Sequence, residues 1–184
     1  RIYVRQHTRN AASRWIYQNI PGALTLTLQT DAGAFLQPLP YRAGDTLSDT
    51  EPFSQPFIAV SDGVIQSVTF PYILDQSQAD FNKNVILSVY SPDDLELPLA
   101  ASLIESTFPA TENEWRGTSY TFFFEPAIPI EKDHLYYLKL GLLSENTTLL
   151  LNGSPTVSIM TDEGLTLDSP LPRILQSVRL DQPY

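Results

Sequence analysis

The chain has 184 residues, of which 42% are hydrophobic and 17% charged; this suits one globular domain and argues against disorder. Its net charge of -10, with 11 Lys and Arg residues against 21 acids, argues against a nucleic-acid partner, because phosphate binding needs a basic face. The absence of cysteine excludes disulfides, thiolate nucleophiles and Cys-ligated zinc.

The first predicted element is an amphipathic helix at about residues 8–19. Its apolar residues fall at helical spacings and form one stripe, which consists of Ala12, Trp15, Ile16 and Ile20. Pro21 should end the helix near Asn19, because proline disfavours the α conformation in the residue before it, and Gly22 then turns the chain. We expect the stripe to be buried, either against the rest of the chain or against a part of the protein outside this sequence.

Most of the remaining chain is predicted to be β-strand. Residues 23–30 alternate leucine with polar residues, which predicts a half-buried strand. Residues 31–56 hold four prolines and a polar run, so we expect a long surface loop with a short strand near residues 34–39. Further strands are predicted at 63–73, 85–91, 99–106, 117–126, 134–144, 147–153, 156–162 and 173–180.

These elements define the expected architecture. About eight or nine strands, not counting the short one near residues 34–39, without an intervening helix predict an all-β fold, a two-sheet antiparallel β-sandwich of jelly-roll type with one short N-terminal α-helix. The sandwich is expected to cover residues 23–184. Residues 1–22 are expected to be a helix and linker, and because the sequence starts at Arg1 and not at a methionine, we expect it to be processed or cut from a longer protein. No apolar run approaches the ~20 residues of a membrane-spanning helix, and there is no signal-peptide pattern.

Catalytic residue types are present but form no recognisable motif. His7 and His134 have no second ligand at metal-type spacing, and no serine lies in a G-x-S-x-G elbow. Several acids offer material for a glycosidase pair, namely Asp93, Asp94, Glu112, Glu114 and Glu125, but their spacing does not show that two of them face one cleft. We expect no catalytic residue.

The sequence likewise contains no motif typical of a metal or cofactor site. The loop sequences SPDD, TENE and TDEG contain oxygen ligands suitable for calcium, but they lack the ordered spacing of an EF-hand. We expect no cofactor, and a structural calcium ion is the alternative.

Carbohydrate binding is better supported by residue type. Sugar rings stack on exposed aromatic faces, and Trp115 lies beside Arg116 in the polar loop TENEWRGTSY. Tyr72, Tyr41 and Tyr90, near strand ends, are the further candidates. The alternative for Trp115 is a plug over one end of the sandwich.

The opening sequence RIYVRQHTRNAASRWIYQNIPGALTLTLQ resembles the segment that follows the last transmembrane helices of bacterial membrane glycosyltransferases of the GT-C type, relatives of the dolichyl-phosphate mannosyltransferases and oligosaccharyltransferases. The matching positions of the pattern HTR-x-x-A-S-x-W-I-Y-x-N-x-P-x-G are His7, Thr8, Arg9, Ala12, Ser13, Trp15, Ile16, Tyr17, Asn19 and Pro21. Gly22 departs from the pattern because it follows the proline directly. Residues 57–160 resemble, more loosely, jelly-roll accessory modules such as carbohydrate-binding modules, through the run SYTFFFEPAIPIEKDHLYYLKL.

These resemblances imply a role at the membrane, with residues 1–22 as a helix and linker that continue from a membrane region. We expect a non-catalytic accessory domain of a membrane glycosyltransferase on the extracytoplasmic face of the cell membrane. Its expected partners are a glycan or lipid-linked sugar and the transmembrane portion of its own parent chain. Two alternatives remain open, a free-standing hydrolase acting on polysaccharide and a purely structural or adhesion module of the cell surface.

Overall fold

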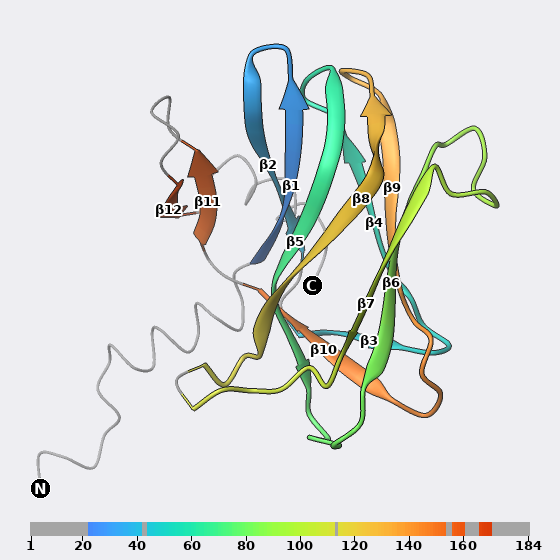
Figure 1. The fold of residues 1–184 in the computed structure, drawn as a ribbon, viewed down its shortest axis with the longest axis vertical. Helices are drawn as coiled ribbons and strands as arrows, with labels where there is room; N and C mark the ends of the chain where they lie inside the picture. The colour runs from blue at the N-terminus through green and yellow to red at the C-terminus, as the bar shows by residue number, and fades with distance from the viewer. Residues whose placement is uncertain (1–21, 42–43, 113, 154–155, 161–165, 171–184) are drawn as a thin grey trace, which may run out of the picture.

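Every regular element in the described part of the chain is a β-strand (Figure 1). The computed structural model describes residues 22–41, 44–112, 114–153, 156–160 and 166–170. The strands are β1 (Gly22–Thr30), β2 (Gly33–Tyr41), β3 (Asp45–Ser48), β4 (Phe53–Ile58), β5 (Gly63–Asp75), β6 (Lys83–Tyr90), β7 (Ala100–Ser106), β8 (Thr118–Ile130), β9 (Leu135–Leu142), β10 (Thr148–Asn152), β11 (Thr156–Met160) and β12 (Thr166–Pro170).

These strands form two main antiparallel sheets. The first has the order β2-β1-β5-β10-β3, and β8 pairs with the opposite edge of β5. The second has the order β4-β9-β6-β7, while β11 and β12 form a separate antiparallel pair. The predicted all-β class and antiparallel pairing are confirmed, and the architecture is sandwich-like.

Alternation of apolar and polar residues accounts for the core. In β1 the side chains of Leu24, Leu26 and Leu28 are fully buried, while those of Thr25 and Thr27 on the other face are only partly covered. The same period-two pattern in β9 buries its tyrosine and leucines at positions 136, 138, 140 and 142. One continuous cluster contains buried side chains of both sheets, so burial of their inner faces supplies the main stabilisation.

The expected long loop at 31–56 is wrong, because this stretch contains three strands, β2, β3 and β4. Only the short strand expected near residues 34–39 is present, as part of β2. The prolines misled the prediction: Pro38 and Pro40 lie in β2 and Pro56 in β4, and both strands are at the edge of a sheet. An edge strand tolerates proline because some of its NH groups have no partner strand to reach.

The other strand predictions agree with the structure wherever it describes the chain. The run at 99–106, in which alanine and leucine also suit a helix, is strand β7. Strand β12 was not predicted, because TLDSP has the composition of a turn. The predicted helix at 8–19 and the predicted strand at 173–180 lie outside the described residues.

One ion pair is completely buried where β5 leads into β6. The Nζ of Lys83 lies 2.7 Å from Oδ2 of Asp75, and the two side chains are 0% and 1% exposed. Asp75 also accepts hydrogen bonds from the backbone NH and the hydroxyl of Ser77 and from the backbone NH of Ala79. Burial alone would raise the pKa of Asp75, but the hydrogen bonds from Lys83, Ser77 and Ala79 outweigh it and hold this pKa below its usual value.

Candidate functional site

Trp115 lies in the connection between β7 and β8, where two short turns follow each other. Thr111 and Glu114 exchange two backbone hydrogen bonds of 3.2 and 3.1 Å, and the NH of Gly117 donates to the carbonyl of Glu114 at 3.4 Å. Trp115 therefore occupies the second position of the tight turn 114–117. Its side chain is 67% exposed, so the indole is at the surface and not in the core.

Gly117 holds this turn directly against β5. Its φ is +109°, a conformation that side-chain-bearing residues rarely adopt. A Cβ at this position would overlap the carbonyl oxygen of Ile73. This close approach packs the C-terminal end of the turn against β5.

Arg116 holds the turn in place through an ion pair with Glu114 and a contact with the ring of Tyr72. Its guanidinium donates from Nε to Oε1 of Glu114 at 2.6 Å and from Nη2 to Oε2 at 2.5 Å, which is a bidentate pair. The same guanidinium lies 4.1 Å from the ring centroid of Tyr72, and its Nη2 donates to the Tyr72 hydroxyl at 3.0 Å. Hydrogen bonds from Arg116 hold the pKa of Glu114 below its usual value, so this carboxylate stays charged at neutral pH.

Tyr41 and Asn152 support the turn from inside the domain. The Tyr41 hydroxyl donates to the backbone carbonyl of Asn152 at 2.7 Å, and Asn152 Nδ2 donates to the carbonyl of Arg116 at 2.7 Å. Asn152 is also the β10 partner of Tyr72 in the sheet register. A short chain of contacts thus runs from the core to the residue beside Trp115.

The structure brings all four predicted sugar-binding residues to one end of the domain, but in different roles. Trp115 is exposed, Arg116 and Tyr72 hold its turn, and Tyr41 is completely buried. Tyr41 therefore offers no face to a sugar, so its prediction as a sugar-binding residue is wrong and its role is to support the turn. Burial is also the main cause that raises the pKa of its hydroxyl. Tyr90 ends β6 in the other sheet, paired with a β9 residue, and does not join this group.

Sequence reasoning missed the supporting roles of Glu114 and Asn152. The sequence could have indicated the pairing of Glu114 with Arg116, since the acid stands two residues before the arginine in one loop. Asn152 ends an apolar strand, and only the pairing of β10 with β5 places it beside Arg116. We call Glu114, Trp115, Arg116, Tyr72 and Asn152 the Trp115 site.

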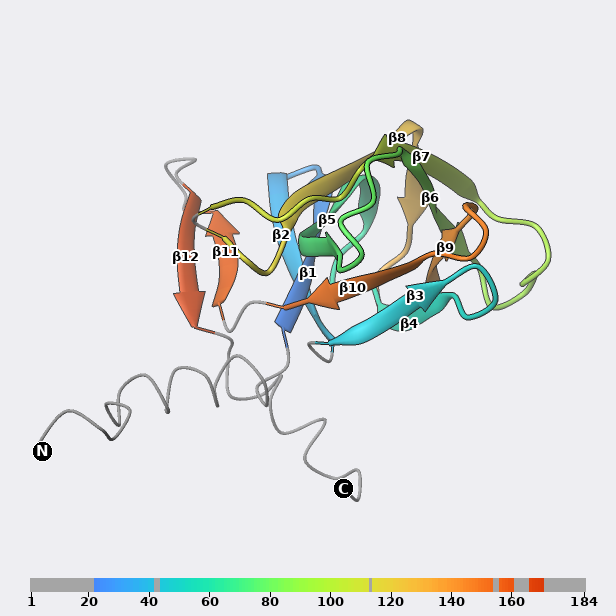
Figure 2. The same cartoon turned by 90° about the horizontal axis from the view of Figure 1, so that it is seen from below.

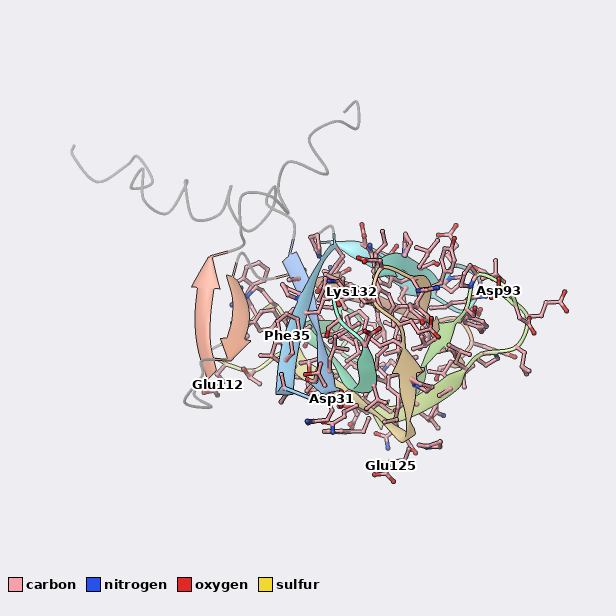
Figure 3. The ribbon with its side chains drawn as sticks, turned by 90° about the horizontal axis from the view of Figure 1, so that it is seen from above. Asp31, Phe35, Asp93, Glu112, Glu125 and Lys132 are labelled. Carbon is pink, nitrogen blue, oxygen red and sulfur yellow. The ribbon has the colours of Figure 1, made fainter. Side chains whose placement is uncertain are left out.

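Of the acids considered for hydrolysis, only Glu112 and Glu114 share a loop, and Glu114 is paired with Arg116. Figure 3 labels Asp93, Glu112 and Glu125, which lie at three separate places on the domain. Asp94 accepts backbone hydrogen bonds from Glu96 and Leu97 within its own loop, which lower its pKa. This arrangement gives no support to a pair of catalytic carboxylates.

An open depression of about 620 Å³ lies between the β5–β6 and β9–β10 connections. Its lining residues are Gln76, Ser77, Ala79, Phe81, Glu145, Asn146, Thr147 and Thr148. It contains a single carboxylate, that of Glu145, and so lacks the acid–base pair of a glycosidase.

Neither a metal-binding cluster nor a membrane-spanning helix occurs in the described residues. No group of three or more His, Cys, Asp or Glu side chains there is arranged to hold a metal ion. His134 lies at the surface, with Nε2 3.6 Å from a carboxylate oxygen of Glu131. Within those residues no helix has the length and apolar character needed to cross a membrane.

Comparison with known proteins gives no family assignment: no protein-family model, no curated protein and no solved structure matches this chain.

Proposed function

We propose that this chain is a non-catalytic carbohydrate-binding domain of jelly-roll type, with Trp115 as its sugar platform. The observation that carries the proposal is a 67% exposed tryptophan on a turn fixed at both its ends. A tryptophan side chain gains much from burial, and leaving it in water is costly unless a partner covers it. A sugar ring presents an apolar face that matches the flat indole, and its hydroxyls remain in water or bond to neighbouring polar groups.

The turn is suited to binding because it is ordered before a ligand arrives. The bidentate pair of Arg116 with Glu114, the stacking of Arg116 on Tyr72 and the hydrogen bond from Asn152 fix the backbone on the C-terminal side of Trp115. A preformed platform loses little conformational entropy when a ligand binds, so more of the contact free energy contributes to affinity. The exposed carboxylate of Glu112 is available in the same loop to accept hydrogen bonds from sugar hydroxyls.

The parent protein is inferred from the opening motif. Residues 7–21 resemble the segment after the last transmembrane helices of GT-C membrane glycosyltransferases, and this supports an accessory domain on the extracytoplasmic face. There the domain would hold a glycan, a lipid-linked sugar or an acceptor close to the transmembrane portion of its parent chain. The separated acids described above do not favour the hydrolase alternative.

A glycan array with the full chain tests the proposal, followed by titration of the best ligand. Trp115→Ala should weaken binding at least tenfold, equivalent to about 1.4 kcal/mol. Phe123→Ala is the matched control, because Phe123 is 66% exposed on β8 outside the Trp115 site and its loss should leave affinity unchanged. The proposal is wrong if no glycan binds, or if both variants bind as the wild type does.

A further inference from the structure

The chain contains two acceptor sequences of the form N-x-S/T for N-linked glycans, and their asparagines lie in different surroundings. One sequence is Asn146-Thr147-Thr148 and the other is Asn152-Gly153-Ser154. Asn152 is buried, and its Nδ2 donates to the carbonyl of Arg116 at 2.7 Å. A sugar linked to this nitrogen would collide with the turn that carries Arg116. Asn152 is therefore not a suitable acceptor in the folded domain.

Asn146 lies in the turn between β9 and β10 and is exposed. The Thr147 hydroxyl donates to the carbonyl of Ser144 at 2.8 Å, and the backbone NH of Asn146 donates to Oδ2 of Asp49 at 3.1 Å. These contacts hold the turn without using the side-chain amide of Asn146. Its φ is +54°, a left-handed conformation that asparagine adopts more readily than most residues. Thr148 is exposed as well, so the acceptor amide and the hydroxyl two positions later are both accessible.

A surface suited to the first sugar of a glycan lies beside this amide. The β5–β6 and β9–β10 connections lie at the lower end of the domain in Figure 1 and face the viewer in Figure 2, and the open depression of about 620 Å³ lies between them. Asn146 lines it together with Phe81, whose ring is 48% exposed. An anion would meet Glu145 and no basic side chain among the lining residues, and an apolar ligand would find only Phe81 and Ala79. A sugar fits better, because it combines hydroxyls with an apolar ring face that can pack on an aromatic ring.

The buried ion pair holds Phe81 in place from below. Nζ of Lys83 donates to the carbonyls of Ala79 and Phe81 at 3.3 and 3.1 Å and lies 4.1 Å from the centroid of the Phe81 ring. Asp75, the partner of Lys83, accepts a hydrogen bond from the backbone NH of Ala79. The ring is thus ordered before a sugar arrives, which lowers the entropy cost of the contact. A sugar linked covalently to Asn146 would also have a high effective concentration there, so a weak contact is sufficient.

We infer that Asn146 is the acceptor of an N-linked glycan whose first sugar lies in this depression against Phe81. The donor is an oligosaccharide linked to a lipid pyrophosphate, and a separate oligosaccharyltransferase catalyses the transfer. Nδ2 of Asn146 forms a bond to C1 of the first sugar while the bond from C1 to the pyrophosphate oxygen breaks. The lipid pyrophosphate leaves with the electron pair of that bond, and the amide gives one proton to a base of the enzyme. No group is oxidised or reduced.

In the cell, this modification rests on the extracytoplasmic location given with the proposed function, because N-linked glycans belong to exported proteins. It requires no sugar binding by Trp115. An experiment that supplies the compartment itself separates the two proposals. Its failure would leave carbohydrate binding by Trp115 open, and a negative glycan array would leave the modification of Asn146 open.

Thermodynamic comparison of four proteins tests where the first sugar lies. The full chain is directed by an added signal peptide into the lumen of a secretory pathway that contains an oligosaccharyltransferase, and an endoglycosidase then trims the glycan to its first sugar. In urea unfolding, this sugar should lower the unfolding equilibrium constant of the wild type about fivefold, the size expected for one contact with an aromatic ring. Phe81→Ala should remove most of this effect, whereas Leu143→Ala, the control, should preserve it, because Leu143 is equally exposed but does not line the depression. An equal effect in Phe81→Ala, or no effect in the wild type, would overturn the contact with Phe81.

Mass spectrometry of the same secreted chain tests the acceptor. We expect one glycan per chain, and its release by peptide N-glycanase should leave aspartate at position 146 in the peptide map. Thr148→Ala should abolish the glycan, and Thr148→Ser should retain it, because serine keeps the acceptor sequence. Ser154→Ala is the matched control, since it removes only the acceptor sequence of Asn152 and should leave the glycan unchanged. A secreted wild-type chain without a glycan, or with a glycan on Asn152, would overturn the inference.

Discussion

Lys83→Met removes the positive charge of the buried ion pair and should strongly destabilise the domain. Methionine keeps much of the unbranched apolar stem of lysine, so the change tests charge more than volume. In the variant, Asp75 retains its hydrogen bonds from Ser77 and Ala79 but loses the ammonium group 2.7 Å away. A charged, 1% exposed carboxylate is then left without that counter-charge.

The magnitude follows from what each partner keeps. Removing one member of a buried pair costs about 3–5 kcal/mol of unfolding free energy. Lys83→Met should lower the unfolding free energy by about 3 kcal/mol, because Asp75 keeps the hydrogen bonds from Ser77 and Ala79. Asp75→Asn should lower the unfolding free energy by about 5 kcal/mol, because the new amide NH₂ would face other hydrogen-bond donors. The buried ammonium of Lys83 would then keep as partners only the carbonyls of Ala79 and Phe81 and the ring of Phe81.

Urea unfolding followed by circular dichroism measures both variants. With a slope of about 2–3 kcal/mol/M for a domain of this size, a loss of about 3 kcal/mol lowers the midpoint by about 1 M or more. Lys139→Met is the control, since Lys139 is exposed on β9, and it should change stability by less than about 0.5 kcal/mol. The reasoning is refuted if Lys83→Met stays within about 1 kcal/mol of the wild type.

The same pair predicts how stability depends on pH. The pKa of Asp75 is lower in the folded than in the unfolded state, so its stabilising contribution is complete above the unfolded pKa of about 3.9. The contribution is lost as the pH falls through the lowered folded pKa. Below about pH 4, the unfolding free energy of the wild type should fall more steeply than that of Asp75→Asn. Parallel curves would show that Asp75 has an ordinary pKa.

Two further substitutions test how the Trp115 site is held together. In thermal unfolding, Gly117→Ala should lower the melting temperature by several degrees more than Gly44→Ala, because both positions have positive φ but only a Cβ at 117 meets backbone atoms. Equal shifts of the two melting temperatures would contradict the close approach of Gly117 to β5. Tyr41→Phe should cost about 1–3 kcal/mol in urea unfolding, because the carbonyl of Asn152 loses its buried donor, and a neutral result would mean that water replaces the hydroxyl.

The fold was predictable wherever local patterns decide the structure. The alternating leucines of β1 and the tyrosine and leucines of β9 identify these strands because burial of one face imposes a period of two. Strand β4 was missed and β2 was predicted only in part, because their prolines indicate a loop in isolation and only their place at sheet edges makes proline acceptable. Local sequence does not contain the order of strands in a sheet.

The candidate site was predictable in part for the same reason. The polar loop around Trp115 was compatible with an exposed indole or with a plug over one end of the sandwich, and the structure shows it exposed. Tyr41 looked equivalent to Tyr72 because each lies near a strand end, yet Tyr41 is packed in the core and its hydroxyl bonds to Asn152, 111 positions away. Contacts between residues so distant in sequence arise from strand pairing and leave no local signal.

The hydrogen bond between Tyr41 and Asn152 also joins the place where the chain enters the two main sheets to the place where it leaves them. Gly22 pairs with Tyr41, and Asn152 is the last residue of β10, so entry and exit are neighbours. A folded unit with adjacent ends can be spliced into a loop of a larger polypeptide without forcing the flanking segments apart. The same geometry would let a host protein gain or lose this unit in a single insertion or deletion, with its own fold left intact.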